Sequence, residues 1–289
     1  MANGISFAAM TTTQHLQRPF GRLAFTVDGP ADGPLVVLVP GMGDLRTTWA
    51  PVLPELHAHG YRTAALDLRG HGETDPVGPR GHGVEGIAAD ALALAEHLGA
   101  TPQRPAVLVG SSVGAGGVAR AAADRPDLVA GVALLAYAAN DGRASGAVRA
   151  QINLLLRRPW GPRAWAWFYG TLVKAPVDVR AHLADLRRDL ARPGHLEQLR
   201  ALALRLVEGA EDTRLADVTV PVVAITGSAD PESPDPAATL RGVAQTAPHV
   251  TPVLLDGVGH YPQHEAPAAV AEHLVALVDR VAGGADRRA

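Results

Sequence analysis

The chain has 289 residues, of which 47% are hydrophobic and 19% are charged, and its formal net charge at pH 7 is −3. This length and composition predict a globular protein of one large or two small domains and exclude general disorder. The weak negative charge gives no reason to expect nucleic acid as a partner, and the lack of cysteine excludes disulfides, thiolate catalysis and cysteine-ligated metals.

The sequence shows no segment that would target the chain to a membrane or across one. Apolar stretches such as residues 35–39 and 132–139 are far too short to span a bilayer, and residues 1–17 lack the basic start and apolar core of a secretory signal. A chain without cysteine also fits a reducing compartment. We therefore expect a cytoplasmic protein with no membrane partner, and we interpret residues 1–18 as a flexible N-terminal lead.

Strands and helices are predicted to alternate through the first half of the chain. Residues 22–27 alternate weakly between apolar and polar side chains, which predicts an early antiparallel strand. Residues 35–39 form a continuous apolar run, which is typical of a strand covered on both faces. After a glycine turn, Thr47 or Thr48 is expected to cap a helix that runs to about residue 59. The pattern then predicts strands over residues 61–66, 106–109 and 132–137 and helices over residues 84–98 and 113–123.

The alternation stops at about residue 139. Helical stretches without a clear strand follow, over residues 148–157, 163–173, 177–190 and 194–208. We interpret residues 140–213 as a helical cap inserted over the carboxyl edge of the sheet. Aromatic side chains gather in this segment, as a pocket for an apolar substrate would need, although such side chains also pack an insertion's own core. The expected pocket residues are Tyr137, Trp160, Trp165, Phe168 and Tyr169.

Strand and helix patterns return after the cap. Strands are predicted over residues 220–225 and 250–255, helices over residues 237–247 and 266–281, and a frayed tail from residue 283. Strands that alternate with helices predict an α/β fold, in which a mostly parallel sheet carries helices on both faces. We place this core in residues 19–139 and 214–289, and we expect functional side chains beyond the carboxyl ends of its strands.

The sequence Gly110-Ser111-Ser112-Val113-Gly114 joins a predicted strand to a predicted helix. It has the form G-x-S-x-G, which places a serine on a sharp turn between the two elements. Glycines are needed there because larger side chains would clash with the adjoining strand and helix. The turn also sets the hydroxyl near a helix N-terminus, where backbone N–H groups can stabilise negative charge. Ser112, rather than Ser111, is therefore the candidate nucleophile.

A serine nucleophile needs a base, which is usually a histidine held in place by a carboxylate. His260 and Asp230 each follow a predicted strand, so both are expected at the same sheet edge as Ser112. The chain order Ser, Asp, His is the order associated with α/β-hydrolases. His264 is the near alternative for the base, and Asp141 is the alternative for the acid.

The loop after the first parallel strand is expected to help stabilise an oxyanion. Two backbone N–H groups are required, and the residue after the nucleophile, Val113, supplies one of them. The other should come from the sequence Pro40-Gly41-Met42-Gly43, in which Met42 is the candidate. Each donor of this kind lowers the barrier by roughly 3 kcal/mol.

Together these stretches resemble α/β-hydrolase fold proteins with a helical cap, specifically esterase-like serine hydrolases. The resemblance rests on residues 38–43, 66–72, 109–114, 227–230 and 257–260, and it covers the chain from about residue 20 to the last helix. It implies structural roles for Asp67, Arg69 and His71. Many relatives have His-Gly where this chain has Pro-Gly at residues 40–41, a difference that leaves the backbone oxyanion donor intact. Relatives that open epoxides or remove halides use an aspartate nucleophile, so Ser112 argues against both reactions.

The sequence thus predicts a serine hydrolase that cleaves an ester or thioester of a small to mid-sized, largely apolar molecule. The resemblance leaves other reactions open on the same three residues: carbon–carbon bond hydrolysis, perhydrolysis, methyl-ester removal, acyl transfer and cyclisation. A small-molecule receptor without turnover is a further alternative. The predicted mechanism needs no cofactor and no metal, and the expected partner is a small-molecule substrate, with a homodimer as a further possibility.

Overall fold

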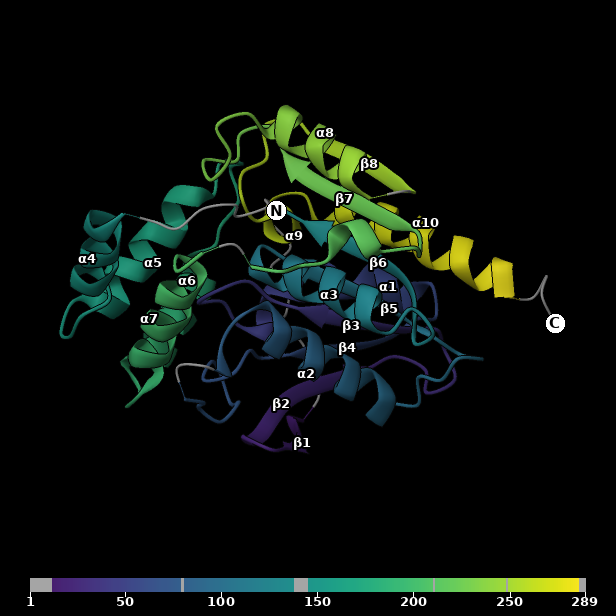
Figure 1. The fold of residues 1–289 in the computed structure, drawn as a ribbon, viewed down its shortest axis with the longest axis horizontal. Helices are drawn as coiled ribbons and strands as arrows, with labels where there is room; N and C mark the ends of the chain where they lie inside the picture. Colours follow the sequence, from purple (N-terminus) through teal and green to yellow (C-terminus); the bar gives the residue numbers. More distant parts are fainter. Residues whose placement is uncertain (1–11, 79–80, 138–144, 210, 248, 286–289) are drawn as a thin grey trace, which may run out of the picture.

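A mixed β-sheet runs through the centre of the chain (Figure 1). The computed structural model describes residues 12–78, 81–137, 145–209, 211–247 and 249–285. Within these residues the strand order is β1-β2-β4-β3-β5-β6-β7-β8. All neighbours from β4 to β8 pair in parallel, whereas β1 and β2 are antiparallel at one edge. The strands are β1 (Gln14–Arg18), β2 (Gly21–Asp28), β3 (Leu35–Val39), β4 (Arg62–Leu66), β5 (Ala106–Ser111), β6 (Val129–Leu135), β7 (Val222–Gly227) and β8 (Val250–Leu255).

Strand β1 corrects one sequence prediction. Residues 14–18 pair with β2, so the flexible lead predicted over residues 1–18 does not extend through them. Residues 1–11 lie outside the described residues.

Helices cover both faces of the sheet and bury one apolar cluster on each face. On one face lie α2 (Val84–His97), α3 (Val113–Asp124) and α8 (Pro236–Thr246), which pack against Val37, Leu108 and other strand residues. On the opposite face lie α1 (Leu53–Ala58) and α10 (Pro267–Ala285), which pack against Val36 and Val109. Successive strand residues point to opposite faces, so each continuous apolar run supplies both clusters. The predicted α/β fold is confirmed.

The helix predicted over residues 47–59 is wrong in its first half. A 3-10 turn, η1 (Arg46–Trp49), precedes α1, and neither threonine caps a helix through its side chain. Pro51 and Pro54 explain the difference, because each removes a backbone donor that a continuous helix would use. The Thr48 hydroxyl instead lies 2.9 Å from Nε2 of His264.

The helices between β6 and β7 lie together at one end of the sheet, on the left of Figure 1. In the described part of this segment they are α4 (Gly146–Leu155), α5 (Gly161–Leu172), α6 (Arg180–Ala191) and α7 (His195–Leu206). Their apolar side chains form a small cluster of their own around Trp165 and Leu199. We refer to these four helices as the cap. Two short elements, η3 (Leu215–Asp217) and α9 (Pro262–Glu265), complete the described structure.

None of the helices within the described residues combines the length and the apolar character that crossing a membrane requires.

Candidate active site

Ser112 lies at the turn between β5 and α3, in a backbone conformation that side chains rarely adopt. Its φ is 53° and its ψ is −119°, and its N–H donates a 2.9 Å hydrogen bond to the carbonyl of Leu135 on β6. A Cβ atom on Gly110 would lie 2.3 Å from the carbonyl oxygen of Gly114, and one on Gly114 would lie 2.4 Å from that of Pro40. The flanking glycines are therefore required by close backbone packing, as the sequence predicts.

His260 and Asp230 meet in the turns that follow β8 and β7. Nδ1 of His260 lies 3.0 Å and 2.9 Å from the two oxygens of the Asp230 carboxylate, and both residues are buried. The two turns touch at Gly227, where a Cβ atom would lie 2.1 Å from the carbonyl oxygen of Val258. Because the carboxylate occupies Nδ1, Nε2 is the imidazole nitrogen left for a reacting hydroxyl.

Ser112 and His260 both line one cavity of about 490 Å³ between the sheet and the cap. The sequence-based alternatives lie elsewhere or are not described. His264 is hydrogen-bonded to Thr48, and Asp141 falls outside the described residues. Among the described carboxylates, Asp230 is the one that meets Nδ1 of His260.

Met42 and Val113, the two candidate oxyanion donors, also line this cavity. Val113 is the first residue of α3, and the first backbone N–H groups of a helix have no partner within the helix. The loop that carries Met42 passes close to the nucleophile, since a Cβ atom on Gly41 would lie 3.3 Å from Cβ of Ser112. The arrangement can therefore present two N–H groups beside Ser112.

The sheet side and the cap both hold the loop after Met42. The N–H of Gly43 donates to Nε2 of His71 at 3.2 Å, and its carbonyl accepts a 2.9 Å hydrogen bond from Nε1 of Trp165 on α5. The next residue, Asp44, is fully buried and contacts two further cap residues. The position of this loop thus depends on the cap as well as on the sheet.

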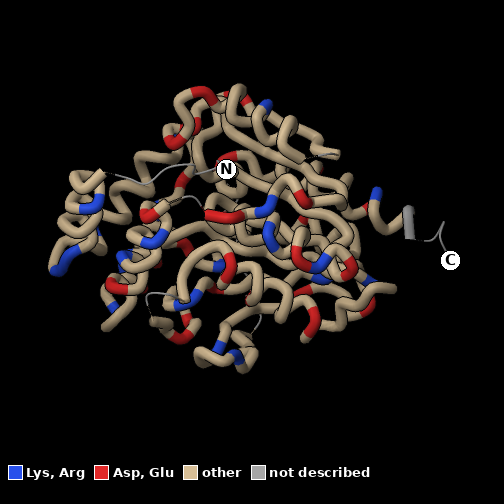
Figure 2. The backbone as a smooth tube through the Cα atoms, viewed as in Figure 1, with Lys and Arg blue, Asp and Glu red and all other residues tan. Residues whose placement is uncertain are grey.

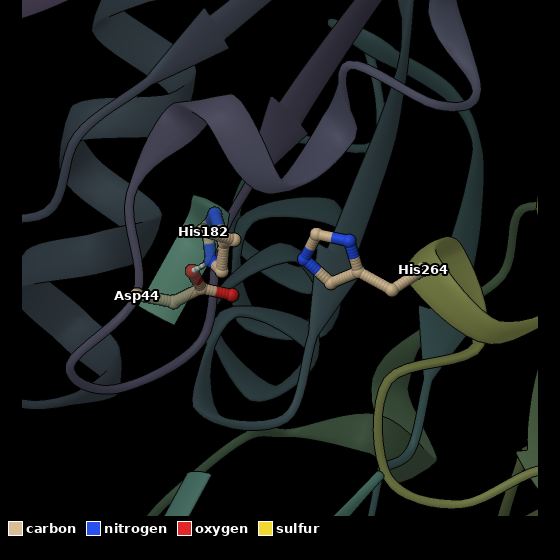
Figure 3. A group of neighbouring side chains, drawn as sticks. All are labelled: Asp44, His182 and His264. Atoms are coloured by element: carbon tan, nitrogen blue, oxygen red, sulfur yellow. Dashed lines mark hydrogen bonds and ion pairs between the residues drawn. The ribbon is translucent and has the colours of Figure 1, made fainter. Parts of the chain in front are cut away.

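Asp44, His182 and His264 form the one group in the described chain whose residue types and spacing could bind a metal ion (Figure 3). Their ligand atoms lie within 4.8 Å of one another. These atoms already have hydrogen-bonding partners. Oδ1 of Asp44 lies 2.7 Å from Nε2 of His182, and Oδ2 accepts from the Tyr169 hydroxyl at 3.1 Å. The geometry therefore fits a hydrogen-bonded joint between the cap and the core, which we call the Asp44 joint.

Two pKa values in the Asp44 joint lie below their usual values, and the physical cause differs between them. Burial lowers the pKa of His264 to about 4, so its imidazole is neutral near neutral pH. Burial alone would raise the pKa of Asp44, but the imidazole of His182, 2.7 Å away, holds it below its usual value. The Asp44 carboxylate thus stays ionised and accepts hydrogen bonds from the cap.

Tyr137, Trp165 and Phe168, three of the five predicted pocket aromatics, line the cavity. The structure places the other two elsewhere, which corrects the prediction for them. Trp160 is 44% exposed, and its indole N–H donates to the carbonyl of Leu154. Tyr169 is fully buried and stacks on Tyr261 with ring centroids 3.8 Å apart, while its hydroxyl contacts Asp44. Neighbouring residues on a helix point in different directions, so an aromatic cluster in sequence does not stay together in space.

The scan against protein families gives a match over most of the chain: residues 36–273 match the alpha/beta hydrolase family. The chain belongs to the alpha/beta hydrolase family. The family resemblance and the prediction of a hydrolase enzyme are confirmed at this level.

Curated proteins and solved structures include relatives of this α/β hydrolase. The uncharacterised protein Rv2715 of Mycobacterium tuberculosis is 28% identical over 273 residues, which cover 86% of this chain and 75% of that protein. A non-heme chloroperoxidase of Streptomyces lividans is 41% identical over 92 residues, which cover 32% of each chain. A thermophilic esterase from Thermogutta terrifontis superposes with a TM-score of 0.75 at 23% identity, over 94% of this chain and 99% of that one. An enol-lactonase from Burkholderia xenovorans gives a TM-score of 0.74 at 22% identity, over 89% and 96%. At these identities the two structures support the fold alone.

Three polar residues that line the cavity of this α/β hydrolase, Glu211, Thr213 and Glu232, are absent from the sequence predictions. Glu211, between α7 and β7, lines the cavity, and its Oε2 accepts from the N–H of Val84 at 2.9 Å. The Thr213 hydroxyl also lines the cavity and lies 2.9 Å from the hydroxyl of Tyr137. A lone acidic residue or threonine at the end of a helical segment gives no recognisable pattern, so only the fold brings these groups to the cavity.

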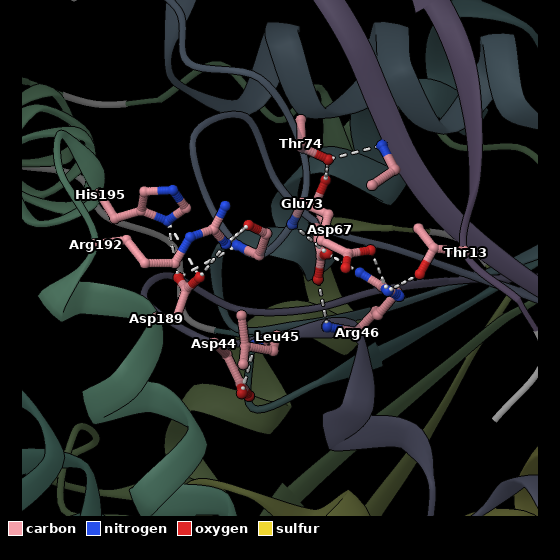
Figure 4. A network of polar contacts seen from close by, with 12 residues as sticks. Thr13, Asp44, Leu45, Arg46, Asp67, Glu73, Thr74, Asp189, Arg192 and His195 are labelled. Atoms are coloured by element: carbon pink, nitrogen blue, oxygen red, sulfur yellow. Dashed lines mark hydrogen bonds and ion pairs between the residues drawn. The ribbon is translucent and has the colours of Figure 1, made fainter. Parts of the chain in front are cut away.

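Asp67, one of the residues with an implied structural role, lies in the network of ion pairs and hydrogen bonds that Figure 4 shows. Asp67 pairs with Arg46, and Arg69 pairs with Asp90. Burial raises the pKa of Asp67, and the Arg46 guanidinium opposes that shift. Asp189 on α6 accepts from the N–H of Gly72, which ties the cap to the loop after β4. These contacts fix the loops on which the site is built.

Proposed function

We propose that this α/β hydrolase is a serine hydrolase that cleaves an ester or thioester of a small to mid-sized, largely apolar molecule. The observation that carries the proposal is the buried pair in which both Asp230 oxygens lie within 3.0 Å of Nδ1 of His260. The pair borders the same cavity as Ser112, a serine held at a positive φ on a sharp turn. A carboxylate on Nδ1 fixes the tautomer that a general base needs.

In the proposed mechanism, Nε2 of His260 removes the proton from Ser112 as Oγ attacks the carbonyl carbon. The backbone N–H groups of Met42 and Val113 stabilise the resulting oxyanion, and Asp230 stabilises the imidazolium. Collapse of the tetrahedral intermediate breaks the ester or thioester bond, and the imidazolium gives its proton to the departing alcohol or thiol. A water molecule, deprotonated by His260, then attacks the acyl group, and the Ser112 oxygen leaves with the returned proton.

The cavity lining supports the proposed substrate class. Its volume of about 490 Å³ suits a small to mid-sized molecule, because ligand pockets usually measure roughly 300–1,000 Å³. Its walls are mainly aliphatic and aromatic, with Trp165 and Phe168 contributed by the cap and Val84 by the core. The same fold is found in a thermophilic esterase and in an enol-lactonase, so it can carry ester and lactone hydrolysis.

Alanine substitutions at two neighbouring serines test the proposal. Ser112→Ala should lower kcat for short p-nitrophenyl esters by at least about 1,000-fold, because the nucleophile is lost. Ser111→Ala is the matched control, since the Ser111 hydroxyl is buried at the end of β5 without a hydrogen-bond partner among the described residues. The control should stay within a few-fold of the wild-type rate. Full activity in the Ser112 variant would end the proposal.

Perhydrolysis is the second candidate, and one comparison favours it. The stretch similar to the Streptomyces lividans chloroperoxidase is 41% identical, the highest identity among the relatives reported above. In this reaction hydrogen peroxide replaces water, attacks the acyl group on Ser112 and releases a peracid together with the free serine. Peracid formation from an acetate buffer containing hydrogen peroxide would support it, whereas ester hydrolysis without any peracid would exclude it.

A further inference from the structure

Exposed apolar side chains concentrate on two helices of the cap. Trp167 on α5 is 70% exposed and Leu154 on α4 is 59% exposed. Val148, Leu155 and Trp160 are also exposed on these helices or between them. Among the large hydrophobic side chains exposed in the described structure, Leu254 alone lies elsewhere. A concentration of exposed apolar side chains on one part of a protein usually marks a binding surface.

Helical spacing places these side chains on outward faces. Val148 and Leu155 are two turns apart on α4, and Trp160, Arg163 and Trp167 follow one another at intervals of three and four residues along α5. The indole N–H of Trp160 donates a 2.9 Å hydrogen bond to the carbonyl of Leu154, which joins the two helices at this point. We call the outward side of α4 and α5 the α4–α5 face.

All charged side chains in the segment that contains α4 and α5 are basic. Residues 142–177 contain six Arg and Lys residues and no Asp or Glu, although the whole chain has a net charge of −3. Figure 2 shows this on α4, at the left of the view, where the coloured segments are blue. Arg149 and Arg158 lie 3.7 Å and 3.5 Å from glutamates of the neighbouring cap segment. Arg157 and Arg163 are exposed, and in the described part of the chain neither has an ion-pair partner.

The α4–α5 face is continuous with the candidate active site. Leu155 is exposed on this face and also lines the cavity that holds Ser112. Ile152 on α4 and Ala164 and Phe168 on α5 line the same cavity. A molecule dissolved in an apolar layer against this face would therefore lie beside the cavity wall.

We propose that the α4–α5 face docks on a phospholipid bilayer whose surface carries anionic headgroups. Tryptophan and leucine side chains enter the boundary between headgroups and acyl chains, while Arg157 and Arg163 contact the phosphates. Tryptophan suits this depth because it has a large apolar ring and one polar N–H group. This docking goes beyond the proposed hydrolase activity and does not depend on it.

The expectation of no membrane partner rests on the total charge and on the lack of a spanning segment. Neither property bears on a single face that lies on a bilayer without crossing it. A whole-chain charge near zero conceals a cationic face because acidic residues elsewhere cancel it.

The tryptophans of the chain report directly on the proposed contact. Trp160 and Trp167 are exposed, whereas Trp49 and Trp165 are buried, so a change in emission on binding comes from the α4–α5 face. The full chain would be titrated with vesicles of phosphatidylcholine alone and with vesicles that also contain phosphatidylglycerol, and binding would be checked by co-sedimentation. We expect a blue shift and co-sedimentation with the anionic vesicles only, both reversed by added salt.

Two double variants and two matched controls locate the contact. Trp160→Ala with Trp167→Ala, and separately Arg157→Gln with Arg163→Gln, should each weaken partitioning into anionic vesicles by about tenfold or more. Leu254→Ala on β8 and the exposed Arg241→Gln on α8 should leave it unchanged. An unchanged circular dichroism spectrum and an unchanged melting temperature would show that each variant remains folded.

Three results would overturn the proposal: no binding to anionic vesicles, equal binding to both vesicle types, or equal losses in the variants and the controls. A concentration-dependent dimer that the tryptophan variant dissolves, without vesicle binding, would assign the face to a second copy of the chain. Each of these results leaves the Ser112 hydrolase proposal intact, because ester hydrolysis in solution is measured separately.

Discussion

The proposed chemistry depends on the hydrogen bond between one imidazole and one carboxylate. Asp230 is buried beside His260, and it also accepts a 2.9 Å hydrogen bond from the N–H of Glu232. That second bond fixes the carboxylate so that both of its oxygens face Nδ1. A substitution that removes the charge of Asp230 and keeps its shape therefore tests both roles of the carboxylate together: it fixes the imidazole tautomer and it stabilises the imidazolium.

Asp230→Asn is this substitution. An amide can donate to Nδ1, which favours the wrong imidazole tautomer, and it does not stabilise the imidazolium. We expect kcat for p-nitrophenyl esters to fall by about 10,000-fold with little change in KM. Steady-state kinetics measure both constants, and a variant with near wild-type kcat would show that Asp230 has no part in the reaction.

His264 makes the stability of the fold depend on pH. Burial lowers its pKa from 6.5 to about 4, so between these pH values the unfolded chain binds more protons at this residue than the folded chain. Protonation of His264 in the unfolded chain therefore lowers the free energy of unfolding as the pH falls from about 6.5 towards 4. This loss of stability is complete below the pKa that His264 has in the folded chain.

His264→Gln should remove this dependence while keeping a hydrogen-bonding group near Thr48. The difference in unfolding free energy between variant and wild type should shift in favour of the variant by up to about 3 kcal/mol as the pH falls from 7 to 4. Urea unfolding of both proteins across that range measures the shift. A constant difference at every pH would show that the folded chain does not hold the imidazole of His264 neutral.

At the scale of elements, the Asp44 joint connects the cap to the loop that carries Met42. Tyr169 and His182 come from α5 and α6, and both contact the Asp44 carboxylate. Trp165, one turn before Tyr169, donates to the carbonyl of Gly43. If the proposed oxyanion role of Met42 holds, cap contacts made far from any substrate carbonyl will affect the rate.

Tyr169→Phe tests this coupling. It removes one donor to a buried carboxylate and keeps the ring that stacks on Tyr261, so we expect a loss of about 1–2 kcal/mol in the free energy of unfolding. We also expect kcat to fall several-fold with KM unchanged, because oxyanion stabilisation acts in the transition state. Trp167→Phe, on the exposed side of the same helix, is the control. An equal effect in both variants, or none in either, would contradict the coupling.

The sequence predicted those elements whose local pattern agrees with their final surroundings. The buried strands β3 and β5 are continuous apolar runs, and the glycines around Ser112 mark a turn that backbone packing requires. The helix predicted from Thr47 or Thr48 failed because Pro51 and Pro54 interrupt it, and the buried Thr48 hydroxyl is instead bonded to His264, more than 200 positions away. Local patterns contain no information about such a partner.

At the scale of the whole molecule, the fold brings four loops to the carboxyl edge of the sheet and closes them with the cap. The position of Ser112, Asp230 and His260 after strands was predictable, because parallel strands end at a common edge. The cap was predictable as a helical insertion, but its inward and outward faces were not. Trp165 turned towards the cavity, Trp160 and Trp167 turned outward, and Tyr169 turned towards Asp44.

The proposed reaction depends on one claim, that His260 activates the Ser112 hydroxyl. The most direct measurement is intact-protein and peptide mass spectrometry after reaction with an organophosphonate, carried out on the wild type and on His260→Gln. We predict one adduct per chain, located on Ser112, and a labelling rate at least about 1,000-fold lower in the variant. An adduct on another residue, or equal labelling rates in the two proteins, would contradict the claim.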